Sequence, residues 1–215
     1  MDSTTTETID QGSSAFDPTV NSREVILALA VKAIDEGGEA SLRVKKIADD
    51  AGTAVTSIYH FFGSREGLVE AAQIARFEAG YTEGRRMVLE AAGSLETREE
   101  FANLVEKVLR DLFSGRHNFN RLRRINVVGS AVARPELLAA INDSQRLWLT
   151  ELVEGLLIAQ QRGFIAPEAD VATAATWHLI TVNGFAAIEG DSTGADVAKW
   201  VDHYIDTMFR GLGLR

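Results

Sequence analysis

The sequence predicts an all-α fold with about nine helices, and three observations lead to this prediction. Apolar residues recur at spacings of three and four along most of the chain, as they do on the buried face of an α-helix. Proline occurs only at Pro18, Pro135 and Pro167, so long helices can form between these positions. No segment alternates between apolar and polar residues as a half-buried strand does. We therefore expect a small N-terminal helical domain joined to a larger helical domain.

Short helices separated by glycines characterise the first third of the chain. Residues 1–20 are rich in Thr, Ser and Asp with few apolar side chains, so we expect a disordered tail. The next three helices are predicted over residues 21–36, 44–51 and 53–62, and they stop at Gly37, Gly52 and Gly63. Ser64 is a typical N-cap for a longer fourth helix. The predicted domains therefore cover residues 21–68 and 69–215.

Longer apolar stripes characterise the second domain. Helices are predicted over residues 101–113, 117–132, 135–162, 167–189 and 197–212. We expect Pro135 and Pro167 in the first turns of two of these helices, because proline lacks the N–H that a helix leaves unpaired there. Gly163 and Gly190 follow the ends of the same two helices.

Composition narrows the classes of function. The chain has no cysteine, which excludes disulfides, thiol nucleophiles and zinc–thiolate sites. The N-terminus lacks the features of a signal peptide, and no stretch approaches the roughly 18 apolar residues that cross a bilayer, so we expect a cytoplasmic protein without membrane contact. The net charge of −9 argues against nucleic-acid binding through bulk electrostatics. A DNA-binding function must therefore rest on a local motif.

Motifs for catalysis are missing from the sequence. There is no Gly-rich phosphate loop, no G-x-S-x-G and no pair of histidines at metal-binding spacing. The four histidines are scattered along the chain: His60, His117, His178 and His203. We therefore expect a protein that is not an enzyme and needs no metal or cofactor.

The two short helices on either side of Gly52 form a candidate helix-turn-helix motif. Gly52 permits a sharp reversal, because a Cβ is costly where φ is positive. The second helix of such a motif must be slim to enter a major groove, so its outward side chains should be small or polar. These side chains are Thr53, Ala54, Thr56, Ser57 and His60. Ile58 and Phe62 are expected to face the protein interior.

A set of residues between Arg23 and Leu68 follows a known pattern. These residues are Ile47-Ala48, Ala51-Gly52, Ile58-Tyr59, Phe62, Ser64-Arg65-Glu66 and Leu68. In register they match I-A-x-x-A-G-V-S-x-x-T-L-Y-x-x-F-x-S-K-E-x-L, with conservative changes. The region therefore resembles the N-terminal domain of the TetR family of bacterial transcription regulators. The rest of the chain resembles that family only in the number and lengths of its helices.

The resemblance implies a DNA-reading helix that begins at Thr53. It implies DNA contacts by ten residues: Arg43, Lys45, Thr53, Ala54, Val55, Thr56, Ser57, Tyr59, His60 and Arg65. Among these, Tyr59, His60 and Arg65 are expected to lie against phosphates. Two alternatives remain open, namely that Tyr59 is a core aromatic and that His60 is a solvated surface residue.

The reading helix departs from the family pattern in its charge. Val55 and Thr56 replace the family's common basic residue and its Gly or Pro, so the helix carries no Lys or Arg. The N-terminal arm is acidic rather than basic. Sequence readout would therefore depend on hydroxyl groups, on contacts with thymine methyls and on DNA shape.

The resemblance also implies that the second domain binds a small effector and that the last two helices form a dimer. Candidate effector residues are His117, Asn118, Arg121, Gln145, Trp148, Trp177, His178 and Asn183, with Asn120 and Asn126 also considered. The candidate dimer residues are the apolar stripe of the last helix: Trp200, Val201, Tyr204, Ile205, Met208 and Phe209. Alternatively, this stripe covers the core of a single chain, and each polar candidate has a structural role.

The sequence thus predicts a TetR-like repressor that binds a palindromic operator in double-stranded DNA as a homodimer and responds to a largely apolar small molecule. In this hypothesis, effector binding displaces the helices around the pocket and bends the helix that begins near Arg65, with Gly80 and Gly84 as bending points. The alternative is a helical module that binds a ligand or a protein without specific DNA binding. The acidic net charge and the uncharged reading helix favour this alternative.

Overall fold

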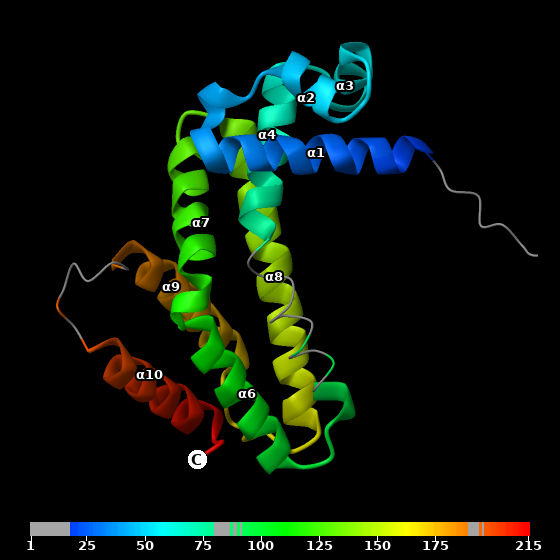
Figure 1. Cartoon of the computed structure of the whole chain (residues 1–215). Helices are drawn as coiled ribbons and strands as arrows, with labels where there is room; N and C mark the ends of the chain where they lie inside the picture. Colours follow the sequence, from blue (N-terminus) through cyan, green and yellow to red (C-terminus); the bar gives the residue numbers. More distant parts are fainter. Residues whose placement is uncertain (1–17, 80–86, 88–89, 91, 189–193, 195) are drawn as a thin grey trace, which may run out of the picture. The chain divides into compact units, whose positions relative to one another are not determined.

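The computed structural model describes residues 18–79, 87, 90, 92–188, 194 and 196–215, and every regular element within them is helical (Figure 1). The α-helices of this part of the chain are α1 (Pro18–Gly37), α2 (Val44–Asp50), α3 (Val55–Phe62), α4 (Arg65–Glu78), α6 (Arg98–Leu112), α7 (Asn118–Ala131), α8 (Pro135–Gln161), α9 (Val171–Ile188) and α10 (Val197–Leu212). Two short 3-10 helices join them, η1 (Glu39–Ser41) and η2 (Gly115–His117). The prediction of an all-α fold is confirmed.

The start of α1 differs from the predicted start. The helix begins at Pro18 rather than at Asn21. Proline suits a first turn, where its missing N–H leaves no hydrogen bond unmade. The predicted tail up to residue 17 lies outside the described residues, and so do the proposed bending points Gly80 and Gly84.

The chain divides into two compact units, residues 1–69 and 70–215, and α4 carries residues of both. In the first unit, α1 packs against η1, α2 and α3, and α2 packs against α3. The buried apolar side chains of this unit are Ile26, Ala30, Ile34, Leu42, Ile47, Ala48, Ile58, Leu68 and Val69. The apolar stripes of the sequence therefore close a small core and leave the opposite helix faces exposed.

A tight turn at Gly52 connects α2 to α3. Gly52 has a φ of +64°, a left-handed conformation that disfavours any residue with a Cβ. The backbone N–H of Thr53 donates to the carbonyl of Ala48 at 3.0 Å, and the N–H of Gly52 donates to the carbonyl of Asp49 at 3.2 Å. The reversal predicted at this glycine is confirmed.

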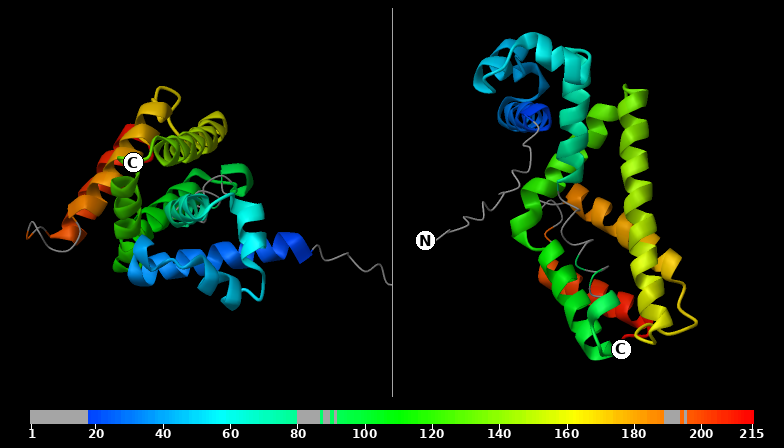
Figure 2. Two further views of the ribbon diagram at one scale, coloured as in Figure 1. Left: turned by 90° about the horizontal axis from the view of Figure 1, so that it is seen from above. Right: turned by 90° about the vertical axis from the view of Figure 1, so that its right-hand side faces the viewer.

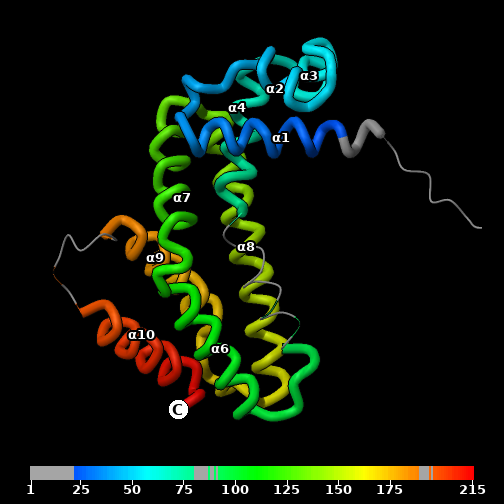
Figure 3. Tube along the Cα trace, viewed as in Figure 1, coloured from blue at the N-terminus to red at the C-terminus, as the bar shows by residue number. Residues whose placement is uncertain are grey.

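The second unit has a buried cluster that α6, α8, α9 and α10 share. α8 runs antiparallel to α7, as the trace in Figure 3 shows. α9 packs against α7, α8 and α10, and Figure 2 shows α9 and α10, in orange and red, next to each other. At the centre, the ring of Phe113 meets three rings edge to face at centroid distances of 5.0 to 5.2 Å: Phe185, Trp200 and Tyr204.

α9 begins at Val171 rather than at Pro167, so the predicted start was wrong. Asp170 caps the helix, because its side chain accepts the backbone N–H of Thr173 at 2.9 Å. The side-chain amide of Gln160 holds the preceding turn by donating to three of its carbonyl oxygens at 2.8 to 3.3 Å. The aspartate cap fixes the start because its carboxylate satisfies an N–H that the first turn leaves unpaired.

α9 carries no charged residue, and its 18 residues are long and apolar enough to cross a membrane by composition. This corrects the expectation that no stretch of the chain reaches that length. In this fold 33% of the helix is buried, and His178 and Asn183 interrupt its apolar surface. The same composition is typical of a core helix with a second apolar face, so the helix is weak evidence for a membrane span.

Substitution of Gly52 tests the turn. Gly52→Ala should lower the free energy of unfolding by about 1 kcal/mol, because alanine is strained at a φ of +64°. The matched control is Gly129→Ala, at an exposed position in the last turn of α7, where an added Cβ meets no atom within 4 Å. The control should raise the free energy of unfolding by about 0.5–1 kcal/mol. Urea unfolding followed by circular dichroism measures both changes, and equal effects would contradict this role for Gly52.

Candidate functional site

The outward face of α3 collects most of the residues predicted to contact DNA. The exposed ones are Ala54, Thr56, Tyr59 and His60, and the half-buried ones are Thr53, Val55 and Ser57. Ile58 is fully buried and holds α3 on the core of the first unit. Tyr59 is 44% exposed, so the alternative that it is a core aromatic is wrong. α3 therefore presents small, hydroxyl-bearing and aromatic side chains to its surroundings.

The lysines of α2 differ in their charge environment. Lys46 forms an ion pair with Asp50 at 2.8 Å, and the hydrogen bond that Lys46 donates to Asp50 raises the pKa of Lys46. Lys45 is exposed and has no ion pair within the described part of the chain. Of these two neighbours, Lys45 is therefore the one whose charge is available to an anion.

Two residues predicted to contact DNA have structural hydrogen bonds in this unit. The guanidinium of Arg65 donates to the carbonyl of Glu39 at 2.8 Å and, more weakly, to that of Leu42 at 3.4 Å. The guanidinium of Arg43 donates to the carbonyl of Ala40 at 2.7 Å. Both arginines thus fix the turn between α1 and α2. Their contact with DNA stays a prediction, and no local pattern of the sequence indicated the carbonyl contacts.

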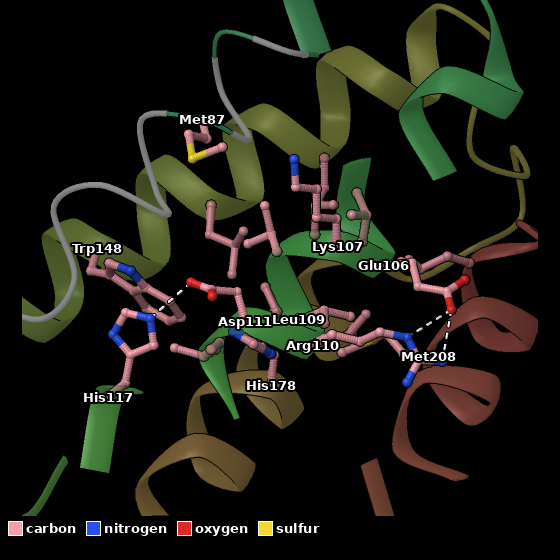
Figure 4. A pocket seen from close by; sticks show the side chains of 18 of the residues that line it. Met87, Glu106, Lys107, Leu109, Arg110, Asp111, His117, Trp148, His178 and Met208 are labelled. Atoms are coloured by element: carbon pink, nitrogen blue, oxygen red, sulfur yellow. Dashed lines mark hydrogen bonds and ion pairs between the residues drawn. The ribbon is translucent and has the colours of Figure 1, made fainter. Parts of the chain in front are cut away.

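A cavity of about 900 Å³ lies in the second unit, and its lining includes residues of α6, η2, α7, α8, α9 and α10 (Figure 4). Its apolar lining includes Val105, Leu109, Trp148, Leu152, Leu156, Met208 and Leu212. Its polar lining includes Asn103, Lys107, Asp111, His117, Asn120 and His178. A cavity of this size and character is typical of a site for a small organic ligand.

Part of the predicted effector set lines this cavity. The lining residues are His117, Trp148 and His178, together with Asn120. The remaining five residues are not among its lining: Asn118, Arg121, Gln145, Trp177 and Asn183. Arg121, for example, is buried elsewhere and donates to the carbonyls of Leu112 and Ser114 at 2.5 and 3.0 Å. The lining residues of α6 were not predicted, although the polar positions beside its apolar stripe were a usable signal.

Asp111 and His117 form a polar pair at the wall of the cavity (Figure 4). A carboxylate oxygen of Asp111 lies 2.8 Å from Nε2 of His117, and Arg116 also contacts the carboxylate. The hydrogen bond from His117, and the positive charge of Arg116 after it, lower the pKa of Asp111. This wall therefore carries an ionised carboxylate whose charge its own neighbours balance.

His178 is the most deeply buried polar group of the lining. Its Nδ1 lies 2.5 Å from the hydroxyl of Tyr204, and its ring stacks on Trp148 at a centroid distance of 5.8 Å. Burial lowers the pKa of His178 to about 4. The imidazole is therefore neutral at physiological pH and offers the cavity a hydrogen-bonding group without a charge.

α4 and α7 are joined by a buried polar contact in the second unit. The guanidinium of Arg76 donates to Gln73 at 2.5 Å and to the side-chain oxygen of Asn126 at 3.2 Å. Two residues earlier on α7, the guanidinium of Arg124 lies over the ring of Phe77, 4.3 Å from its centroid. Burial lowers the pKa of Arg124 to about 9. These contacts fix the end of α4 to the middle of α7.

The six residues predicted to form a dimer interface lie in the core of one chain instead. Val201, Tyr204, Ile205, Met208 and Phe209 are each at most 7% exposed, and Trp200 is half-buried. Periodicity showed that one face of α10 is buried, but the second unit itself covers that face. This is the alternative that the sequence left open.

A different apolar surface is exposed on α9. Trp177, Ile180 and Ile188 are 38%, 63% and 46% exposed, and they lie on the helix face opposite His178 and Val182. The neighbouring exposed positions are small: Thr173, Thr176, Gly184 and Ala187. Large apolar side chains flanked by small ones allow a second helix to approach closely. This surface, named here the α9 outer face, therefore has the character of a helix–helix interface.

Residues 26–72 match the sequence model of a family described as "Bacterial regulatory proteins, tetR family". The matched segment contains α2, the turn at Gly52 and α3. The resemblance of the N-terminal domain to the TetR family is confirmed. Comparison with curated proteins gives no match.

Solved structures with a similar fold cover most of the chain. A Mesorhizobium loti protein assigned to the TetR family has a TM-score of 0.68 at 16% identity, over 93% of this chain and 98% of that one. A Rhodococcus protein assigned to the same family has a TM-score of 0.63 at 21% identity, over 90% and 99%. The regulator FadR from Bacillus subtilis, in complex with stearoyl-CoA, has a TM-score of 0.56 at 23% identity, over 87% and 98%. The chain has the fold of TetR-family transcriptional regulators.

The depressed pKa of His178 predicts a pH-dependent loss of stability. Below pH 6.5 the unfolded chain binds a proton at this histidine, whereas the folded chain binds it only near pH 4. The contribution of neutral His178 to the free energy of unfolding is therefore fully present above pH 6.5. It decreases by about 3 kcal/mol in total as the pH falls toward 4.

The measurement compares the wild type with His178→Phe by urea unfolding at pH 7 and pH 4. The wild type should lose about 3 kcal/mol more than the variant between the two pH values. The exposed His203 provides the control, because His203→Phe should leave the pH dependence of the wild type unchanged. Parallel curves for the wild type and His178→Phe would mean that His178 is not held neutral by burial.

Proposed function

We propose that this chain, which carries a TetR-family N-terminal domain and the fold of TetR-family regulators, is a transcriptional repressor. It binds a palindromic operator as a homodimer in the cytoplasm, and a small molecule releases it. The observation that carries the proposal is the α2–Gly52–α3 element, whose second helix exposes hydroxyl-bearing and aromatic side chains in place of an apolar face.

Sequence readout is assigned to α3 and charge contacts to its surroundings. Thr56 and Ser57 supply hydroxyl groups that can bond base edges, and Ala54 can contact a thymine methyl. The exposed hydroxyl of Tyr59 suits a phosphate oxygen, and Lys45 adds an available positive charge. Because the chain carries a net charge of −9, binding depends on these few contacts and on the fit to the operator.

The effector site is assigned to the cavity in the second unit. Its mainly apolar lining suits a largely apolar ligand, and FadR from Bacillus subtilis, a protein of similar fold, is known in complex with stearoyl-CoA. A ligand that alters α6 also alters α7, because Arg121 ties α7 to the last carbonyl of α6. α7 in turn holds α4 through Asn126 and Arg76. A coupling of about 1–3 kcal/mol along these contacts is the usual size for allosteric control.

The dimer is assigned to the α9 outer face. An uncharged helix that buries one face in its own chain and exposes Trp177, Ile180 and Ile188 on the other suits a two-fold interface. A two-fold dimer places two reading helices about 34 Å apart, which is the spacing of half-sites on one side of a DNA duplex.

Selection from a random DNA pool tests the proposed function. The full chain is incubated with the pool at about 100 mM salt, where phosphate contacts are still strong, and the enriched sequences are titrated against scrambled DNA. An enriched palindrome that is bound at least 1,000-fold more tightly, as is usual for specific binding, supports the repressor. No enrichment by a folded, dimeric sample would favour the helical ligand- or protein-binding module instead.

Substitutions in α2 and α3 should separate charge contacts from sequence readout. Lys45→Ala should weaken binding to all DNA and lower the salt dependence by about one ion, because it removes one phosphate contact. Lys46→Ala is the matched control, since Lys46 is paired with Asp50, and its effect should be smaller. Ser57→Ala should change the preference between operators instead. Fluorescence anisotropy over a salt series measures all three, and equal effects of the two lysines would contradict this assignment.

Charge substitution on the α9 outer face should disrupt the dimer. Ile180→Glu places a carboxylate at the most exposed large apolar side chain of α9, and burying it against a partner is unfavourable. Sedimentation equilibrium should show at least a hundredfold weaker dimer, about 3 kcal/mol. Leu147→Glu on α8, which is 56% exposed, is the matched control and should remain dimeric. If only the control variant Leu147→Glu is monomeric, the dimer interface lies on α8 instead.

A further inference from the structure

Trp148, His178 and Tyr204 form a buried group at one wall of the cavity. His178 and Tyr204 are 8% and 3% exposed, and Nδ1 of His178 lies 2.5 Å from the Tyr204 hydroxyl. The rings of Trp148 and His178 stack with an interplanar angle of 23°. Trp148 and His178 both line the cavity, and Figure 4 shows His178 extending from α9 toward it.

The hydroxyl of Tyr204 determines where His178 carries its proton. In the part of the chain that the structure describes, the only polar contact of this hydroxyl is Nδ1 of His178. If Nδ1–H donated to the hydroxyl oxygen, the buried O–H would have no acceptor, which is costly. The hydroxyl therefore donates to Nδ1, and the single proton of the neutral imidazole lies on Nε2.

Nε2 of His178 has no hydrogen-bond partner among the described residues. The atom keeps some accessible surface, and His178 is one of the residues that line the cavity. At the wall of a mainly apolar cavity, this N–H donor is satisfied by no protein group that the structure describes. It therefore favours a ligand that brings an acceptor atom to this wall.

The acceptor is an uncharged one. The cations that line the cavity are exposed, and two of them are already paired with carboxylates, Arg110 with Glu106 and Arg116 with Asp111. A carboxylate buried against the neutral His178 would thus lose its hydration without gaining a buried opposite charge, which is unfavourable. A carbonyl oxygen accepts the same hydrogen bond at a much smaller cost of desolvation.

We propose that the cavity binds a mainly apolar small molecule that carries a ketone- or ester-type carbonyl, and that Nε2–H of His178 donates to its oxygen. This inference rests on the proposed function in one respect only, namely that the bound molecule is the effector of the repressor. Tyr204 is a positioning residue, because it acts through His178 by fixing the proton on Nε2.

A matched pair of probes tests this assignment on the full chain without DNA. The probes are 2-acetylnaphthalene and 2-isopropenylnaphthalene, which differ only in that a CH2 group replaces the carbonyl oxygen. Equilibrium dialysis gives Kd for each, and the ratio of the two values is the ketone preference of the protein. His178→Phe should lower this preference about fivefold, the worth of one neutral hydrogen bond. Both probes lose the same contacts with the ring of His178 in this variant, so that loss cancels in the ratio of their Kd values.

Two further variants make the outcome specific. His178→Gln keeps an N–H donor at about the position of Nε2 and should retain most of the ketone preference. Tyr204→Phe leaves His178 in place but frees its proton to occupy either nitrogen, so it should lower the preference by a smaller factor. This graded order is not expected if His178 only fills space.

Three results bear on the inference and on the proposed function separately. An unchanged ketone preference in His178→Phe, or no binding of either probe to the folded wild type up to their solubility limits, overturns the inference. If the protein prefers the ketone but DNA selection gives no enrichment, the inference is supported and the assignment as a repressor is overturned. If the protein binds DNA specifically but does not prefer the ketone, the repressor proposal is retained and only the assignment of the ligand is overturned.

Discussion

The hydrogen bond between Tyr204 and His178 is the contact on which the second unit depends. α10 must bury its apolar face, and Tyr204 lies in the middle of that face with a hydroxyl that needs a partner once it is buried. His178 is its partner, and burial raises the pKa of Tyr204, so the phenol keeps the proton that it donates. One contact therefore sets the position of α9 against α10, the tautomer of His178 and the polarity of one cavity wall.

α9 is consequently constrained on two sides. Its inner face supplies His178 to the cavity, and its outer face presents an apolar surface that includes Trp177. The ring of Trp177 lies 5.0 Å from that of Tyr204 while 38% of its surface is exposed. A ligand that moves His178 thus acts on Tyr204 and, through it, on the α9 outer face. Under the proposed function, this provides a second route from the ligand to the operator, through the geometry of the dimer rather than through α4.

Sequence reasoning succeeded where the cause is local. Helical periodicity identified the helices, and Gly52 was recognised because a tight turn between two short helices requires a residue that tolerates a positive φ. The motif from Ile47 to Leu68 then gave the family resemblance. The start of α9 was misplaced because two start signals, Pro167 and Asp170, compete within four residues and only the turn geometry decides between them.

The failures concern contacts between distant parts of the chain. The apolar stripe of α10 predicted that one helix face is buried, but it did not indicate which surface covers that face. The predicted dimer interface is therefore an intrachain core. For Arg65, whose phosphate contact stays a prediction, residue type did not reveal the hydrogen bonds to carbonyls 26 and 23 residues earlier in the chain. In the cavity, polar residue type identified His117 and His178, but the side of the helix on which Arg121 lies depends on packing.

The scarcity of positive charge on α3 has a consequence for how the proposed repressor works. Non-specific DNA affinity grows with the number of phosphates that a protein neutralises, and this chain offers few unpaired cations near α3. Away from its operator such a protein binds DNA weakly, so the difference between specific and non-specific sites comes from the fit of α3 to base edges. An effector then needs only a small shift in the separation of the two reading helices to remove that fit, because no large electrostatic attraction remains to hold the protein on the duplex. A coupling free energy of about 1–3 kcal/mol, which one ligand hydrogen bond and a rearranged apolar cavity can supply, is sufficient for such a switch.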